Sequence, residues 1–329
     1  RIRLARNLAG YSFLNRAQPS QRRKIERILF EAISSTDFGK ETFYVDIDKS
    51  DALDRQFLVE RHLISRQHAE GEGSRGVAIS NSETLALMIN EEDHLRIQVL
   101  RRGLNLDGAW EETARVDAAL ETLVDFAYDK QYGYLTACPT NVGTGLRVSV
   151  MLHLPALKLT NELEKVFRAA KEMRLAVRGL HGEGTDALGD FFQVSNQITL
   201  GTSEDEILDS FKADVIPSIV KYEQEARRAL QEGKTVALDD KIYRALGLLE
   251  NARAISSEEA LFLLSHLRMG VVLQRIKHID LEAISELFLA TQSAHLQKKF
   301  GQALDGEQRS IVRAEFIRDR LDHCRPSDN

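Results

Sequence analysis

Apolar and polar side chains alternate with a period of two between Leu146 and Leu154. This period predicts a β-strand with one buried and one open face, because successive side chains of a strand point to opposite sides. The open face carries a cation, Arg147. Two glycines, Gly143 and Gly145, precede the strand, and backbone N–H groups in such a loop can approach an anion closely. The stretch predicts a sheet that is buried on one side only.

Similar patterns predict other strands and one loop in the first part of the chain. Strands are predicted for residues 42–48, 84–89 and 194–200, and a short strand begins at Ala176. Residues 66–76 are polar and rich in glycine, and we expect a mobile loop there.

Helical spacing of apolar residues predicts a helix within residues 114–128, where the stripe covers a core. Capping-box patterns predict three more helices, which begin at Asn161, Ser203 and Ser256. The character of the chain changes near residue 226, since no proline occurs from Ser218 to Arg325 and several helical segments follow. We therefore predict two domains, at residues 1–226 and 227–329, the second of which is all-helical.

Composition and charge narrow the class of protein. The net charge of −6 over 329 residues argues against a general nucleic-acid-binding protein. The first 30 residues nevertheless carry eight Lys or Arg against one acid, part of which we assign to the solvated side of an amphipathic helix. The two cysteines make no disulfide framework, and no apolar run approaches the ~20 residues of a membrane helix. A cytoplasmic location without membrane association is expected, although the chain starts at Arg1 rather than Met.

The segment from Cys138 to Thr144 reads Cys-Pro-Thr-Asn-Val-Gly-Thr and leads into the strand that bears Arg147. Alone, a cysteine is most often buried filler and a glycine-rich turn is most often only a turn. Together these residues resemble the active-site segment of the phosphagen (ATP:guanido phosphotransferase) kinase family.

Three other segments strengthen this resemblance. Arg1-Ile2-Arg3 is similar to the end of the family's Ser-x-Arg-[Ile/Val]-Arg nucleotide-binding motif. Residues 90–96 read Asn-Glu-Glu-Asp-His-Leu-Arg, where three acids in a row would otherwise indicate a hydrated turn, and resemble the family's Asn-Glu-Glu-Asp-His-x-Arg motif. Residues 178–183 resemble its Arg-Gly-x-x-Gly-Glu loop.

The resemblance implies a role for each matched residue. The catalytic residues implied are Glu92, Glu183 and Cys138. The ATP-binding residues implied are Arg1, Ile2, Arg3, His62, Arg96, Arg147, Val148, Ser149, Val150, Met151, Arg178, Gly179, Leu180, His181, Gly182 and Glu183. No metal-ligand motif is present, which suits a Mg²⁺ ion held chiefly by ATP and water.

These residue types suit phosphoryl transfer to a guanidinium. A guanidinium is a poor nucleophile, because it keeps its proton and delocalises its lone pairs. Two carboxylates, Glu92 and Glu183, can bind it, aim one nitrogen at the γ-phosphorus and accept the proton. A Cys138 thiolate can contact the other nitrogens. The arginines and Mg²⁺ would neutralise the phosphates, so that positioning and electrostatics carry catalysis.

The family resemblance also implies the fold and the acceptor. The expected fold class is α+β, with a mainly antiparallel sheet whose open face holds ATP and whose other side is covered by helices. The chain starts inside the catalytic domain and adds helices after it, a layout similar to bacterial members that phosphorylate arginine side chains of proteins and mark them for Clp-type degradation. Expected partners are therefore proteins with exposed arginines, an activator or adaptor protein, a Clp-type unfoldase and possible second copies of the chain.

One motif departs from these bacterial members. They carry an Arg-Asp-x-x-Arg-Ala motif that forms a phosphoarginine pocket, whereas this chain has Arg309, Ser310, Arg313 and Ala314 at the matched positions. Without the Asp carboxylate, the pocket would keep its phosphate ligands but hold the guanidinium less well. The competing interpretation is a helix with two exposed arginines.

Two other functions remain open from the sequence. One is a kinase for free arginine or another small guanidino compound, which differs only in the acceptor. The other is a catalytically silent adaptor that binds partners through the basic patch and the helical domain. Loss of Glu92, Glu183 or Cys138 would favour the adaptor, and all three are present.

Overall fold

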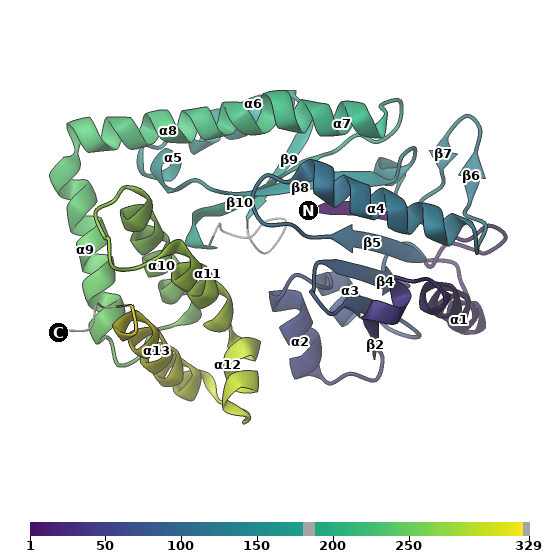
Figure 1. Cartoon of the computed structure of the whole chain (residues 1–329), viewed down its shortest axis with the longest axis horizontal. Helices are drawn as coiled ribbons and strands as arrows, with labels where there is room; N and C mark the ends of the chain where they lie inside the picture. Colours follow the sequence, from purple (N-terminus) through teal and green to yellow (C-terminus); the bar gives the residue numbers. More distant parts are fainter. Residues whose placement is uncertain (180–187, 325–329) are drawn as a thin grey trace. The chain divides into compact units, whose positions relative to one another are not determined.

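The structure is a computed structural model that describes residues 1–179 and 188–324. The chain forms two compact units (Figure 1). The first contains Arg1–Val150, Glu172–Ala176 and Ser195–Pro217, and the second contains Met151–Lys171, Val177–Val194 and Ser218–Asn329. Residue 226 lies within a helix, α8 (Ile216–Gly233).

An eight-stranded sheet runs through the structure in the order β2-β3-β4-β5-β1-β8-β10-β9. Its strands are β1 (Ile2–Arg6), β2 (Thr42–Asp46), β3 (Gly76–Ser80), β4 (Leu85–Ile89), β5 (Leu95–Val99), β8 (Leu146–His153), β9 (Leu175–Gly179) and β10 (Phe191–Asn196). The pairs β2–β3, β3–β4, β4–β5, β1–β5 and β1–β8 are antiparallel, as the family resemblance implies. A small hairpin of β6 (Tyr128–Asp129) and β7 (Gly133–Tyr134) stands apart from this sheet.

The first unit also contains helices on both faces of the sheet. They are α1 (Pro19–Ser35), α2 (Ala52–Glu60), α3 (Arg66–Glu70), α4 (Leu106–Glu121) and α7 (Glu204–Ser210), with short helical turns η1 (Gly39–Glu41), η2 (Pro139–Asn141) and η4 (Phe211–Val215). α4 packs on β1 and β5. Its Asp117 pairs with Arg6, which shares a strand face with Ile2 and Leu4.

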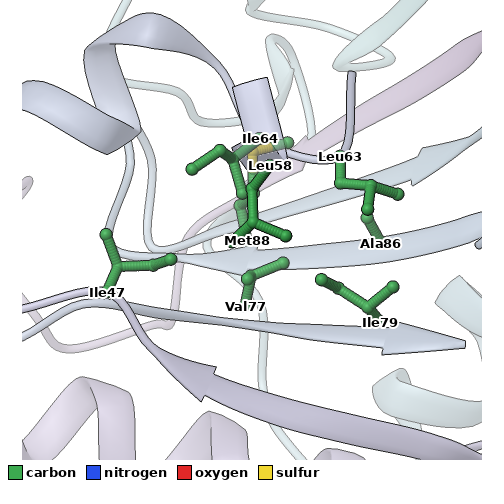
Figure 2. Close-up of a cluster of buried hydrophobic side chains, with 8 residues drawn as sticks. All are labelled: Ile47, Leu58, Leu63, Ile64, Val77, Ile79, Ala86 and Met88. Carbon is green, nitrogen blue, oxygen red and sulfur yellow. The ribbon is translucent and has the colours of Figure 1, made fainter. Parts of the chain in front are cut away.

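The opposite face is covered by helices only in part. Val77, Ile79, Ala86 and Met88 of β3 and β4 are buried there against Leu58 of α2 and neighbouring residues (Figure 2). Met88 pairs with Arg96 of β5, so both side chains point to this face. Helices therefore also cover part of the face that was expected to be open, because β3 and β4 are apolar on both faces and need a second cover.

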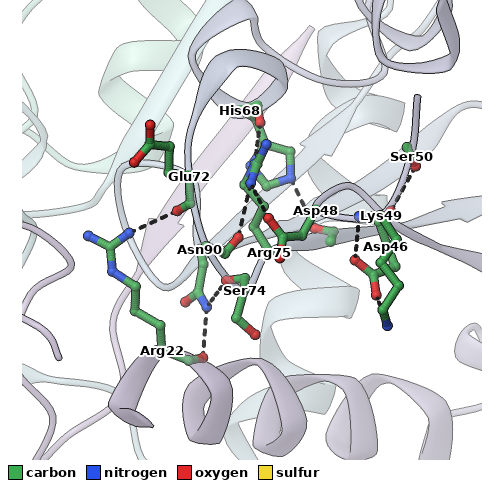
Figure 3. Close-up of polar contacts among 12 residues, drawn as sticks. Arg22, Asp46, Asp48, Lys49, Ser50, His68, Glu72, Ser74, Arg75 and Asn90 are labelled. Atoms are coloured by element: carbon green, nitrogen blue, oxygen red, sulfur yellow. Dashed lines mark hydrogen bonds and ion pairs between the residues drawn. The ribbon is translucent and has the colours of Figure 1, made fainter. Parts of the chain in front are cut away.

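The segment predicted as a mobile loop is organised around one buried arginine. Residues 66–70 form α3, capped by Ser65, whose side chain accepts a hydrogen bond from the His68 amide. The Arg75 guanidinium, only 4% exposed, donates to the carbonyl oxygens of His68 and Gly73 and to Asp48 (Figure 3). The glycine content of residues 66–76 did not indicate this ordered structure, because one arginine side chain can donate hydrogen bonds to several loop carbonyls at once.

A second buried arginine ties the sheet to α4. Arg6 Nε and Nη2 donate to the two carboxylate oxygens of Asp117 at 3.0 and 2.6 Å, and Nη1 donates to the Thr144 carbonyl at 2.9 Å. The guanidinium also lies 3.4 Å from the ring centre of Tyr134. Arg6 is 2% exposed and belongs to the covered face, so it is a structural cation rather than part of a surface patch.

Replacing Asp117 with alanine should destabilise the protein by about 3–5 kcal/mol, because it leaves the Arg6 charge buried without its carboxylate. Thermal or urea denaturation measures the loss. The control is Glu31→Ala, which removes an exposed partner 3.9 Å from Arg27 and should cost about 0–1 kcal/mol. Equal losses in the two variants would contradict the structural role of the Arg6–Asp117 pair.

The second unit is mainly helical. Its helices are α5 (Pro155–Leu159), α6 (Leu163–Glu172), α8, α9 (Thr235–Asn251), α10 (Ser257–Val272), α11 (Leu281–Ala290), α12 (Ser293–Phe300) and α13 (Gly306–Asp322), and the turn η3 (Leu188–Asp190) precedes β10. α10 packs against α9, α11 and η3. Ser265 of α10 donates to Asp190 at 2.6 Å and lies 2.8 Å from His153 Nε2. Burial and the nearby Arg268 and Arg227 keep the pKa of His153 well below its usual value, so this ring is neutral.

Most predicted elements are confirmed, with shifted ends. β2, β4, β8 and β9 occupy the predicted stretches, and Ser203 and Ser256 cap their helices. The helix predicted within residues 114–128 is α4, which begins earlier because Asn105 caps it. The helix predicted from Asn161 is present as α6, but its predicted cap is wrong, because α6 begins at Leu163 and Asn161 takes a left-handed φ of 60°. The last strand ends at Asn196, before the predicted end.

No helix in the described part of the chain is both long and apolar enough to cross a membrane.

Candidate active site

Arginine side chains share the part of the sheet that α2 and α3 leave uncovered. Arg3 of β1 pairs with Arg147 of β8 on one side and with Gln98 of β5 on the other. Arg1 pairs with Ser149 through two backbone hydrogen bonds of 2.9 Å. Arg96 lies opposite Ala5, one step further along the same face. We call Arg1, Arg3, Arg96 and Arg147 the arginine cluster.

The guanidinium groups of the arginine cluster lower the pKa values of two of its members, Arg1 and Arg3. Burial, followed by repulsion from Arg96 and Arg147, lowers the pKa of Arg1 to about 10. Burial and the guanidinium groups of the other three also hold the pKa of Arg3 well below its usual value. Arg3 Nε is buried and has no hydrogen-bond partner among the described residues. Like charges gathered at a sheet face favour a polyanionic ligand, such as a triphosphate.

The three consecutive acids form the turn between β4 and β5. The turn is closed by a hydrogen bond from Asn90 N to His94 O at 2.9 Å. Arg96 binds two carboxylates at once, since Nη1 donates to Glu91 at 2.7 Å and Nη2 donates to Glu92 at 3.0 Å. The Glu91 side chain is 1% exposed, whereas that of Glu92 is 32% exposed. Only Glu92 is therefore accessible to a substrate.

The environment separates the two carboxylates electrostatically. Burial alone would raise the pKa of Glu91, but Arg96 and the Ser65 hydroxyl outweigh it and lower that pKa. Burial raises the pKa of Glu92, and repulsion from the adjacent Glu91 and Asp93 raises it further. Arg96 lowers this pKa, but the net shift is upward. A carboxylate with a raised pKa accepts a proton more readily, so Glu92 suits a general base and Glu91 suits a permanent anchor for Arg96.

A buried aspartate joins the acid turn to the cysteine loop. Asp93 Oδ1 accepts hydrogen bonds from Ala137 N at 2.6 Å and from Asn7 Nδ2 at 2.7 Å. Asn7 also binds His94 N and Leu135 O. Since Asp93 follows Glu92 and Ala137 precedes Cys138, this tie brings the predicted base and the predicted thiol to one end of the sheet. The Cys138 Sγ lies 3.0 Å from Thr140 Oγ1.

The other residues predicted to bind ATP lie in different environments. The side chains of Ile2 and Val148 are buried on the covered face, away from the arginine cluster, so they can meet ATP only through backbone groups. Val150 is buried on the same side as Val148. The His62 carbonyl accepts a hydrogen bond of 2.7 Å from Gln98, which pairs with Arg3.

The remaining predicted residues of the catalytic motifs belong to the second unit. Met151 is 37% exposed on β8. Arg178 and Gly179 are the last two residues of β9. Leu180, His181, Gly182 and Glu183 lie outside the described residues.

Two clefts and the arrangement of potential metal ligands were compared with the predicted site. Two clefts, of about 690 and 500 Å³, lie in the first unit, and none of the predicted site residues lines them. Within residues 1–179 and 188–324, no group of three His, Cys, Asp or Glu is placed to hold a metal ion. An Mg²⁺ ion that accompanies ATP fits the site only through phosphate and water oxygens.

Comparison with known proteins decides the family. Residues 24–226 match the model of the ATP:guanido phosphotransferase C-terminal catalytic domain. The chain belongs to the ATP:guanido phosphotransferase family. Residues 235–329 of this guanido phosphotransferase match a second model, the protein-arginine kinase McsB C-terminal domain.

Similar proteins cover nearly the whole chain. The protein-arginine kinases of Halothermothrix orenii and Symbiobacterium thermophilum are 45% and 46% identical to this guanido phosphotransferase over 98% of its length, covering 91% and 92% of their own. Among solved structures, lombricine kinase is 28% identical with a TM-score of 0.60 over 71% of this chain and 66% of its own. The predicted fold class, a guanido kinase catalytic fold with a helical C-terminal region, is thereby confirmed.

The arginines of the predicted phosphoarginine pocket are bound to backbone oxygens in this guanido phosphotransferase. Arg313 is 2% exposed and donates to the carbonyls of Thr291 and Ile255, both at 2.8 Å. Arg309 is half-buried and donates to Leu304 O at 2.6 Å. Arg313 shares the buried side of α13 with Ala314, so the competing view of two exposed arginines does not describe this helix.

Ser310 is half-buried, and its hydroxyl donates to Gly306 O of its own helix at 3.0 Å. A Ser310→Asp variant should bind phosphoarginine about tenfold more tightly than the natural chain, because a carboxylate there can pair with the ligand's guanidinium. Isothermal titration with free phosphoarginine measures both affinities, and Gln308→Asp on the exposed side of α13 is the control. Equal affinity of the natural chain and the Ser310 variant would contradict the prediction.

Sequence reasoning missed the residues that form hydrogen bonds to the predicted site residues or to their neighbours. Glu91, Ser65, Asp93 and Asn7 each bind a predicted site residue or its neighbour. Asp93 and Asn7 stand inside or next to the matched motifs, and their side chains are buried amid backbone donors and acceptors. Their position beside a motif was the only signal available, since their partners are remote in sequence.

Proposed function

We propose that this guanido phosphotransferase transfers the γ-phosphoryl group of Mg·ATP to arginine side chains of proteins. The observation that carries the proposal is the tie between Asp93 and Ala137, which sets Glu92 and Cys138 at one end of a sheet face lined by the arginine cluster. Relatives named protein-arginine kinase, similar over 98% of the chain, support a protein acceptor.

The described residues suggest how the reaction proceeds. A guanidinium nitrogen of the acceptor attacks the γ-phosphorus, the P–N bond forms and the bond to the ADP oxygen breaks. Glu92 binds the guanidinium and accepts the proton that the attacking nitrogen loses. The Cys138 sulfur lies at the other nitrogens. The arginine cluster and Arg178 hold the phosphates, and Mg²⁺ offsets the charge of the nucleotide.

We also propose that Glu183, which lies outside the described residues, is the second carboxylate. The proposed location is the cytoplasm. The proposed partners are proteins with exposed arginines, an activator or adaptor protein, a Clp-type unfoldase and a second copy of the chain. Marking of proteins for degradation under stress would follow from protein acceptors.

Mass spectrometry tests the proposal directly. Unfolded casein is incubated with the enzyme and Mg·ATP, and the digest is kept at neutral or alkaline pH because P–N bonds are acid-labile. We expect phosphoarginine in the casein peptides and far less of it with Glu92→Gln. A parallel assay with free arginine separates the second candidate, a small-guanidino kinase, which would phosphorylate arginine but not casein. Absence of both products would refute the proposed function.

A further inference from the structure

The segment Asn196–Thr199, at the end of β10, lies between two parts of the active site. It belongs to the stretch Ser-Asn-Gln-Ile-Thr-Leu-Gly at residues 195–201, to which the reaction assigns no role. Asn196 is 6% exposed and Thr199 is 4% exposed, and both side chains are fully engaged in hydrogen bonds. We call this segment the brace.

Asn196 holds the backbone on both sides of Arg147. Its side-chain Oδ1 accepts from Val148 N at 2.8 Å, and its Nδ2 donates to Leu146 O at 3.0 Å. Nδ2 also donates to Ile198 O at 3.0 Å. The side-chain amide of Asn196 thus forms, with the residues on either side of Arg147, the two hydrogen bonds that a neighbouring strand would form through its backbone.

Asn196 also contacts the Arg147 side chain. Arg147 Nε donates to the Asn196 carbonyl at 3.3 Å. This contact opposes the electrostatics of the cluster, because Arg147 pairs with Arg3 across the strands and like charges push the two guanidinium groups apart. A hydrogen bond from Arg147 to this fixed backbone acceptor restricts the rotamers of the Arg147 side chain.

Thr199 holds the loop that bears the cysteine. Its Oγ1 lies 3.0 Å from Thr140 O and 2.7 Å from Val142 O, so one hydroxyl proton serves two loop carbonyls. The Thr199 carbonyl in turn accepts from Thr144 N at 3.3 Å.

The loop base approaches the brace too closely for any side chain at residue 143. Gly143 has a φ of 109°, and a Cβ there would lie 2.4 Å from Thr199 O. Gly143 and Tyr134 close the loop with a pair of backbone hydrogen bonds of 2.8 and 3.2 Å. The loop with Cys138 between these ends is therefore seated on the brace at its base and on Asp93 near the cysteine.

We propose that the brace is a two-ended positioning element, in which Asn196 sets the phosphate ligand Arg147 and Thr199 sets the thiol loop. The inference rests on the proposed function, because it assigns Arg147 to the nucleotide and Cys138 to the acceptor. Neither brace residue touches substrate. The two ends act on different substrates, so their replacements have different kinetic signatures.

Asn196→Ala tests the nucleotide end. It removes the hydrogen bonds at Leu146 and Val148, and we expect the Kd for Mg·ADP, measured by titration, to rise about tenfold or more. The KM for casein should stay within about twofold. An unchanged Kd for Mg·ADP would overturn the nucleotide half of the proposal, whatever the phosphoryl-transfer rate.

Thr199→Val tests the thiol end with little change of shape. We expect the Kd for Mg·ADP to be unchanged, kcat/KM for casein to fall about tenfold or more, and the alkylation rate of Cys138 by iodoacetamide to change. The control is Thr113→Val, which removes a buried hydroxyl bond to Ala109 O of 2.7 Å in α4 and should alter none of these values.

Comparison of the variants separates positioning from general stability. If Asn196→Ala and Thr199→Val shift nucleotide affinity and casein kinetics in parallel, or if Thr113→Val has the same effects at equal thermal stability, the brace is only structural and the proposal is overturned. Failure of the natural enzyme to modify casein would refute the proposed function, while nucleotide affinity and Cys138 alkylation would still decide the brace.

Discussion

Glu92→Gln is expected to lower kcat about 10³-fold and to leave the Kd for Mg·ADP within about threefold, because glutamine keeps the size of the side chain but cannot accept a proton. The amide can still accept a hydrogen bond from Arg96, which now binds Glu92 at 3.0 Å. Acid-labile phosphate transferred to casein from labelled ATP measures kcat, and titration measures the Kd.

The matched control is Glu70→Gln, an exposed carboxylate of α3, which should have the activity of the natural enzyme. Retention of more than about a tenth of the natural kcat in Glu92→Gln would rule out Glu92 as the principal base.

The same carboxylate predicts a pH dependence. Burial, with added repulsion from Glu91 and Asp93, raises the pKa of Glu92 above its ordinary value. A general base must be ionised to act, so kcat should fall as the pH drops through this raised pKa, at a higher pH than an ordinary glutamate would give. As a control, the residual kcat of Glu92→Gln should not fall with decreasing pH over the range in which the kcat of the natural enzyme falls.

Arg3→Met should have opposite effects on catalysis and on the stability of the ligand-free protein. We expect kcat/KM to fall about 10²–10³-fold, because one fixed donor to the phosphates is lost. Without ligand, the variant should be more stable by about 1 kcal/mol, which raises Tm by about 2–4 °C. The reason is that Arg3 is half-buried, with its Nε fully buried, beside three other guanidinium groups that lower its pKa.

Scanning calorimetry with and without Mg·ADP checks this prediction. The natural enzyme should gain more Tm from Mg·ADP than the Arg3→Met variant, because a ligand at a given concentration stabilises the protein more when it binds more tightly. Arg23→Met removes an exposed arginine of α1 and should change neither activity nor the effect of Mg·ADP. A less stable ligand-free Arg3→Met protein would show that repulsion in the arginine cluster is not a significant cost.

Much of the fold could be predicted because the hydrophobic period determines strands and helices locally. The alternation from Leu146 gave β8, and the family resemblance gave an antiparallel sheet. The second helical cover was not predicted. Its signal was present, since β4 reads Leu-Ala-Leu-Met-Ile without a polar face, which indicates burial on both sides.

The candidate site residues are easier to recognise in the sequence than the residues that contact them. Charged motifs identify residues such as Glu92 and Arg96 because few structural roles require those types in that order. The supports Asp93, Asn7 and Asn196 form contacts with backbone atoms that are distant in sequence, and any polar side chain has many such partners available. The burial of Glu91 beside an accessible Glu92 likewise depends on which way a tight turn points, which the sequence does not specify.

The place of β1 between β5 and β8 affects how the protein is made. Arg3 cannot pair with both Gln98 and Arg147 until β5 and β8 have been synthesised. β1 therefore lacks at least one neighbouring strand while most of the sheet is being translated. Its apolar residues Ile2 and Leu4 are exposed on the ribosome during that time and are open to chaperones or to mispairing. Because association between exposed apolar side chains weakens on cooling, a lower growth temperature should increase the soluble yield of this enzyme.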